Sequence, residues 1–108
     1  MLKGGPLTLD LISDRLRPSL QEAGVEKAIV FGSYARGTQD ARSDVDLILI
    51  MHTEERYLKR FDRIMGVYRA LPEASVEVFI YTPEEFERNA DRTFFKRALS
   101  EGKVIYER

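Results

Sequence analysis

The chain has 108 residues, a formal net charge of −1 and no cysteine. This length predicts a single domain over residues 1–108, and 44% hydrophobic with 32% charged residues predicts a folded rather than a disordered chain. The absence of cysteine excludes disulfides, thiolate metal sites and a cysteine nucleophile. The near-neutral charge excludes a global basic field that would recruit nucleic acid, so any attraction for phosphate must be local. The apolar runs are too short to span a membrane, and residues 1–6 lack the apolar core of a signal peptide, which predicts a cytoplasmic protein without a membrane partner.

The first helix is predicted after a short flexible lead-in at residues 1–6. Thr8 or Asp10 can cap its N-terminus, and Gly24 is a plausible C-terminal stop. We expect Pro18 to kink this helix or to end it early, because proline supplies no N–H to the helical ladder. The apolar positions at helical spacing are Leu9, Ile12, Leu16 and Leu20.

Two apolar runs, at 27–31 and from about 43 to 50, predict two strands joined by a polar loop. Asp44 and Asp46 open the second run and stand two residues apart, so in a strand both side chains project from the same face. Two carboxylates this close repel each other unless a cation lies between them. Mg²⁺ takes oxygen ligands and often accompanies phosphates, which makes it the natural candidate. The alternative is a solvated strand end that is merely acidic.

Residues 54–71 show the spacing of a core-facing helix that ends at Pro72, and 75–81 repeat the design of the second strand, with Glu77 near the start. A strand, a helix and a strand suggest a right-handed crossover between parallel neighbours, which brings Glu77 to the rim that holds the two aspartates. The first strand should then run antiparallel to the second, in a mixed sheet. The apolar positions of the helix are Tyr57, Leu58, Phe61, Ile64, Met65, Tyr68 and Leu71.

The C-terminal part predicts one helix from Pro83, or two helices with a break at 91–93, and a stop at Gly102. Residues 104–106 can add a short final strand. His52, the only histidine, is predicted to lie on the surface away from the acidic rim. The basic residues of the central helix, interpreted as a solvated face, are Arg56, Lys59, Arg60 and Arg63.

The pair Gly32-Ser33, followed after ten residues by Asp44-Val45-Asp46, resembles the signature of the DNA polymerase β-like nucleotidyltransferase superfamily. The whole chain resembles its smallest branch, the minimal nucleotidyltransferases of the MntA antitoxin type. The resemblance implies an α/β (α+β) fold with a small mixed sheet and flanking helices. It also implies that Asp44 and Asp46 hold two Mg²⁺ ions that bridge the phosphates of a nucleotide. Glu77 would be the third ligand, at a position where relatives usually carry aspartate.

Gly32 and Ser33 would bind phosphate, since glycine lets a phosphate approach the backbone and the following N–H groups and the hydroxyl can donate to it. The alternative is an ordinary strand-to-helix turn with Ser33 as N-cap. Arg36, within Gly-Ser-x-Ala-Arg-Gly, is a candidate to neutralise triphosphate or pyrophosphate. Arg42 is a second candidate, or simply an exposed loop arginine.

Three functions remain open. The first is an enzyme that transfers AMP from ATP to a hydroxyl; the resemblance implies a tyrosine of a separate HEPN-domain toxin as acceptor and an antitoxin role. The second is a non-catalytic module that masks such a helical partner. The third is nucleotidyl transfer to a small molecule. The implied partners are a nucleoside triphosphate and the toxin, in a homo- or hetero-oligomer, without direct nucleic-acid binding.

Overall fold

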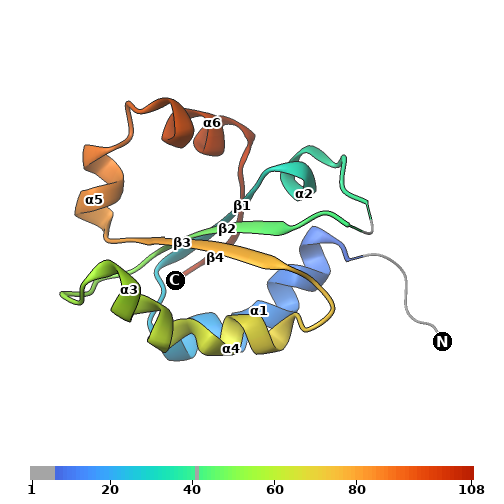
Figure 1. Cartoon of the computed structure of the whole chain (residues 1–108), viewed down its shortest axis with the longest axis horizontal. Coiled ribbons are helices and arrows are strands. Elements are labelled where there is room, and N and C mark those ends of the chain that lie inside the picture. The colour runs from blue at the N-terminus through green and yellow to red at the C-terminus, as the bar shows by residue number, and fades with distance from the viewer. Residues whose placement is uncertain (1–6, 41) are drawn as a thin grey trace.

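A computed structural model describes residues 7–40 and 42–108, so the predicted lead-in at 1–6 lies outside the described residues. The described chain forms a mixed sheet with helices on both faces (Figure 1). Its elements are α1 (Leu9–Ala23), β1 (Lys27–Phe31), α2 (Ser33–Arg36), β2 (Val45–Ile50), α3 (Tyr57–Arg60), the 3-10 turn η1 (Phe61–Ile64), α4 (Met65–Ala70), β3 (Val76–Tyr81), α5 (Pro83–Arg88), α6 (Thr93–Glu101) and β4 (Lys103–Glu107).

The strand order in the sheet is β3-β2-β1-β4. Strands β2 and β3 are parallel, whereas β1 pairs antiparallel with both β2 and β4. The register places Asp46 of β2 between Phe31 of β1 and Glu77 of β3. This confirms the predicted mixed sheet with flanking helices and the parallel crossover that carries Glu77 to the aspartates.

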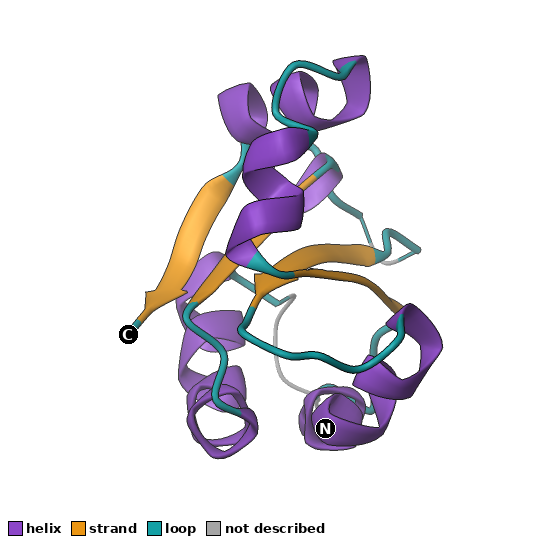
Figure 2. Ribbon diagram, turned by 90° about the vertical axis from the view of Figure 1, so that its left-hand side faces the viewer, coloured by secondary structure: helices purple, strands orange, loops and turns teal. Residues whose placement is uncertain are grey.

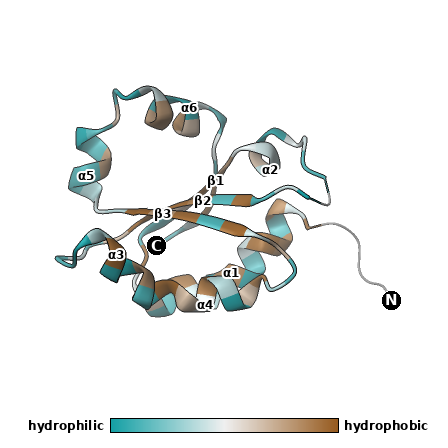
Figure 3. Ribbon diagram, in the orientation of Figure 1, coloured by the Kyte–Doolittle hydropathy of each residue, from teal (hydrophilic) through white to brown (hydrophobic). Residues whose placement is uncertain are grey.

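Helices cover the two faces of the sheet unequally (Figures 1 and 2). Helices α1, α3 and α4 cover one face, and α5 and α6 lie over the other. Alternation along β2 sends Leu47 into the larger core beneath α1 and α4, and Ile48 into a smaller core that includes Ala98 of α6. Both side chains are fully buried. Figure 3 shows hydrophobic colouring along much of the strands and on parts of the helices.

Helix α1 begins and ends where the sequence predicts. The Thr8 hydroxyl accepts a hydrogen bond from the N–H of Leu11 at 3.1 Å, and Gly24 closes the helix with a left-handed φ of +78°. The expectation that the helix ends early at Pro18 is wrong, because Pro18 lies inside it. Leu16 and Leu20, both fully buried, anchor the turns before and after the proline, so burial outweighs one missing donor.

The segment predicted as one helix over 54–71 begins at Tyr57 and divides into α3, η1 and α4. A 3-10 turn has three residues per turn, so it shifts the helical phase of the residues that follow. Met65, predicted to face the core, follows this turn and is therefore 44% exposed. Leu58, in α3 before the turn, is also predicted to face the core but is 81% exposed. Val67, which the uninterrupted helical pattern does not include, is buried instead.

Arg60 is the second departure in this segment. It was expected on a solvated basic face, yet it is 5% exposed. Its guanidinium donates to both carboxylate oxygens of Glu85 at 2.6 and 2.9 Å and to the carbonyl of Ile80 at 3.1 Å. These long-range partners hold Arg60 against the sheet.

The remaining elements follow the predictions closely. Strand β2 starts at Val45, so Asp44 is the residue just before it. The C-terminal helix is a pair, α5 and α6, and β4 is the predicted final strand. His52 is exposed, and its Nε2 lies 2.6 Å from Glu26 Oε2. No helix among the described residues has the length and apolar character needed to span a membrane.

Candidate functional site

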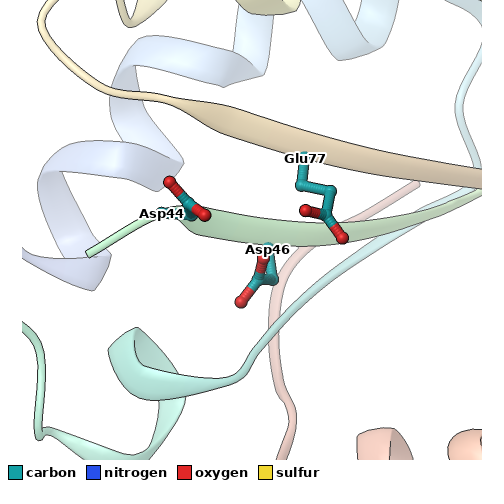
Figure 4. Close-up of side chains that lie close together, drawn as sticks. All are labelled: Asp44, Asp46 and Glu77. Atoms are coloured by element: carbon teal, nitrogen blue, oxygen red, sulfur yellow. The ribbon is translucent and has the colours of Figure 1, made fainter. Parts of the chain in front are cut away.

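Three carboxylates meet at one rim of the sheet (Figure 4). Asp44 directly precedes β2, Asp46 is the second residue of β2, and Glu77 is the second residue of β3. Parallel pairing sets Asp46 opposite Glu77. One ligand oxygen from each residue lies within 4.8 Å of the other two. The sequence-based prediction that Glu77 joins the two aspartates is confirmed.

The charges of this carboxylate triad (Asp44, Asp46 and Glu77) are mutually unfavourable. Burial raises the pKa of the Asp46 carboxyl, and the nearby Glu77 and Asp44 raise it further, while Arg36 opposes them. Asp44 and Glu77 are exposed, so the triad opens to solvent on its outer side. Three oxygen donors that converge and repel one another fit a hard divalent cation such as Mg²⁺, which prefers carboxylate ligands and tolerates an open, partly hydrated site.

The turn after β1 packs against the triad. Gly32 has a φ of +75°, and a Cβ at this position would lie 2.3 Å from Asp46 Oδ2. Its carbonyl accepts hydrogen bonds from the N–H groups of Ala35 and Arg36, each at 3.1 Å, which starts the single turn α2. Gly32 itself is the N-cap and no side chain caps this helix, so the alternative in which Ser33 serves as N-cap is wrong. Ser33 is the first helical residue beside the triad.

The two predicted arginines differ in their surroundings. Arg36, at the end of α2, lies close enough to Asp46 to influence its pKa, and its Nη1 is 3.2 Å from Glu101 Oε1. Arg42 is exposed in the loop before β2, where its N–H donates to Asp40 Oδ1 at 2.8 Å. The structure thus joins Arg36 to the site, whereas the hydrogen bond described for Arg42 is local.

A pocket with a volume of about 420 Å³ adjoins the triad on the side of Gly32. Helix α6 contributes much of its lining, and sequence reasoning did not assign these residues to the site. Their local signal is weak, because Arg97 and Glu101 look like ordinary exposed helix positions until α6 is placed on the sheet. The lining residues are Phe31, Gly32, Arg36, Phe94, Arg97, Ala98 and Glu101.

Comparison with known protein families agrees with this geometry. The family model described as polymerase beta, nucleotidyltransferase, matches residues 15–108. The chain belongs to this nucleotidyltransferase family. A relative in the same family, MJ0604 of Methanocaldococcus jannaschii, is provisionally named a protein adenylyltransferase. It is 30% identical over 83 residues, which cover 76% of this chain and 79% of MJ0604.

Solved structures similar to this nucleotidyltransferase show the same fold. One is a toxin–antitoxin structure with AMP-PNP, with a TM-score of 0.66 and 19% identity, covering 89% of this chain and 73% of the matched chain. Another is a complex of a tri-AMPylated Shewanella oneidensis HEPN toxin with its MNT antitoxin. It has a TM-score of 0.62 and 16% identity, and covers 94% of this chain and 74% of the matched chain.

Proposed function

We propose that this nucleotidyltransferase uses Mg²⁺ to transfer AMP from ATP to a tyrosine hydroxyl of a HEPN-domain toxin, and so acts as an antitoxin. The observation that carries the proposal is the convergence of the carboxylate triad beside the backbone of Gly32. A cation-binding cluster next to an unobstructed turn is suited to a metal-bound triphosphate. Pure masking of a partner would require neither feature.

The residues divide the chemistry among them. Asp44, Asp46 and Glu77 would hold Mg²⁺, which when bound neutralises phosphate charge and lowers the pKa of the attacking hydroxyl. Gly32, Ser33 and Arg36 bind the phosphates. The hydroxyl oxygen forms a bond to the α-phosphorus while the bond from that phosphorus to the bridging oxygen of the β-phosphate breaks, so pyrophosphate leaves with that electron pair. The hydroxyl proton passes to the Glu77 carboxylate and then to solvent.

The acceptor and the partner rest on different support. The name of MJ0604 supports protein as the acceptor, and the structure of the tri-AMPylated HEPN toxin with its antitoxin supports a HEPN-domain partner. The same proposal includes a tyrosine as the acceptor residue, two Mg²⁺ ions, a cytoplasmic location and a homo- or hetero-oligomer. Arg42, exposed in the loop before β2, is proposed as a further phosphate ligand.

The proposal is tested by incubating the protein with ATP, Mg²⁺ and a HEPN-domain toxin, followed by intact-mass analysis of both chains. We expect a gain of AMP on the HEPN protein and none with the Asp44→Asn/Asp46→Asn variant. Omission of Mg²⁺ should also abolish the gain. The catalytic proposal fails if the wild type adds no AMP to the toxin and the double variant silences the toxin as well as the wild type does. The chain is then a masking module.

A further inference from the structure

The pocket beside the triad is lined by two arginines, Arg36 and Arg97, and the proposed mechanism gives a role only to Arg36. Arg36 reaches it from α2, and Arg97 reaches it from α6, about sixty residues later in the chain. Both helices stand on the same side of the sheet (Figure 1). The pocket therefore collects two guanidinium groups next to Gly32, where the backbone carries no side chain.

One carboxylate holds both arginines. Glu101 Oε1 lies 3.2 Å from Arg36 Nη1, and Glu101 Oε2 lies 3.9 Å from Arg97 Nε. Two positive groups share a single negative one, so the cluster keeps an excess positive charge. The side chain of Arg97 is 77% exposed, and exposed ion pairs of this kind contribute little free energy, so they exchange readily for a stronger anion. Arginine pairs with phosphate through two parallel, charge-assisted hydrogen bonds.

The wall of the pocket is apolar. Phe31 and Phe94 meet edge to face, with ring centroids 5.6 Å apart. Phe31 is also the register partner of Asp46, so this wall adjoins the triad directly. An apolar wall excludes water from one side of a bound anion, which strengthens its attraction to the arginines.

The order of residues across the sheet indicates on which side of the triad the leaving group departs. Phe31, Asp46 and Glu77 stand side by side on β1, β2 and β3. If Glu77 receives the proton of the attacking hydroxyl, attack comes from the β3 side. An in-line displacement then sends the leaving group toward β1, where the pocket lies.

We propose that Arg97, together with Arg36, binds the β- and γ-phosphates of the substrate and the pyrophosphate that leaves. This inference rests on the proposed function and adds a binding residue from α6 to it. Glu101 has a positioning role, since in the absence of nucleotide it holds both guanidinium groups at the pocket. The occupant follows from the paired arginines beside Gly32, because a nucleobase would bring no anion to balance the excess positive charge that Glu101 alone leaves.

The test measures binding of Mg²⁺-pyrophosphate and of Mg²⁺-ATP by titration calorimetry. Arg97→Ala is compared with Lys96→Ala, which removes the same charge from the neighbouring exposed position of α6, outside the pocket. We expect Arg97→Ala to weaken both ligands about tenfold, as loss of a charge-assisted contact does. Lys96→Ala should bind both ligands like the wild type, and both variants should melt like it.

Each outcome of these titrations either supports or overturns phosphate binding by Arg97. Equal pyrophosphate affinities for the two variants, or no binding of pyrophosphate by the wild type, would overturn the inference. A loss for ATP without a loss for pyrophosphate would place the nucleoside in the pocket and overturn it as well. The inference stands on its own if Arg97→Ala weakens pyrophosphate while the mass assay shows no transfer, because only the acceptor chemistry of the proposed function would then fail.

Discussion

The space in front of Asp46 exists because residue 32 lacks a side chain. A Cβ there would overlap Asp46 Oδ2, so any other residue must push the carboxylate or the turn away. Gly32 also has a φ of +75°, a conformation that disfavours residues with a Cβ. Gly37 shares the φ of +75°, but a Cβ added to it would meet nothing within 4 Å. A substitution at either glycine strains the backbone, but only a substitution at Gly32 also crowds the site. Comparing the two therefore distinguishes these effects.

Gly32→Ala should lower the transfer rate by about 100-fold, since small displacements of positioned groups are costly in rate. Gly37→Ala should lose stability by roughly 1 kcal/mol through strain alone and keep most of its activity. Transfer kinetics and thermal unfolding of both variants check this. Equal losses of activity would show that strain, and not contact with Asp46, makes Gly32 necessary.

Among the elements, α3, β3 and α5 are joined by one buried guanidinium. Arg60 of α3 donates to Ile80 of β3 and to both carboxylate oxygens of Glu85 in α5. Glu85 also accepts from the N–H of Thr82 at 3.0 Å, which completes a capping box at the start of α5. The pKa of Glu85 is lowered from 4.5 to about 2, chiefly by the hydrogen bond from Arg60 and also by the hydrogen bonds with Thr82.

Glu85→Gln should remove this charge and keep the capping box, because glutamine can also serve there. We expect a loss of about 1–3 kcal/mol of unfolding free energy at pH 7, since Arg60 is left buried with a weaker partner. The folded-state pKa of Glu85 is depressed, so its contribution is present above pH 4.5 and is lost as the pH falls toward 2. Urea unfolding of both proteins between pH 7 and pH 2 measures this. A gap that stays constant over the range would contradict the ion-pair origin.

At the scale of the whole molecule, the two faces of the sheet serve different ends. The face under α1 and α4 carries the larger core, which holds the fold together. The opposite face carries a small core around Ile48, and the same face bears the triad at its rim. Phe79, two residues after Glu77 on β3, packs against this small core. Its ring also packs against the ring of Phe94, with the ring centroids 5.3 Å apart. Packing on this face therefore supports both the triad and the pocket.

Leu47→Ala and Ile48→Ala compare these faces at adjacent, fully buried positions of β2. Each should destabilise the fold by about 2–5 kcal/mol, through lost burial and the cavity that remains. Only Ile48→Ala should also reduce the transfer rate, by roughly tenfold, when both variants are assayed at a temperature at which they remain folded. A matching loss of rate in Leu47→Ala would show that the site depends on overall stability alone.

Sequence alone determined the features that depend on near neighbours in the chain. Alternation with a period of two residues placed Asp44 and Asp46 on one face, and the glycine turn and the Asp-x-Asp spacing identified one rim of β2. The crossover rule added Glu77 because the hand and pairing of a strand–helix–strand unit are strongly constrained. These rules act over a few residues or one connection, so they survive without knowledge of the whole fold.

Only the tertiary structure decided the features that depend on distant partners. The break of the 54–71 segment accompanies the burial of Arg60, whose partner Glu85 lies 25 residues away. Arg97 and Glu101 line the pocket because α6 lies over the sheet. Strand β4, which follows α6, pairs with β1 at the opposite edge of the sheet from β3. Helical periodicity cannot foresee such contacts, since the free energy that selects them comes from surfaces that meet only after the chain has folded.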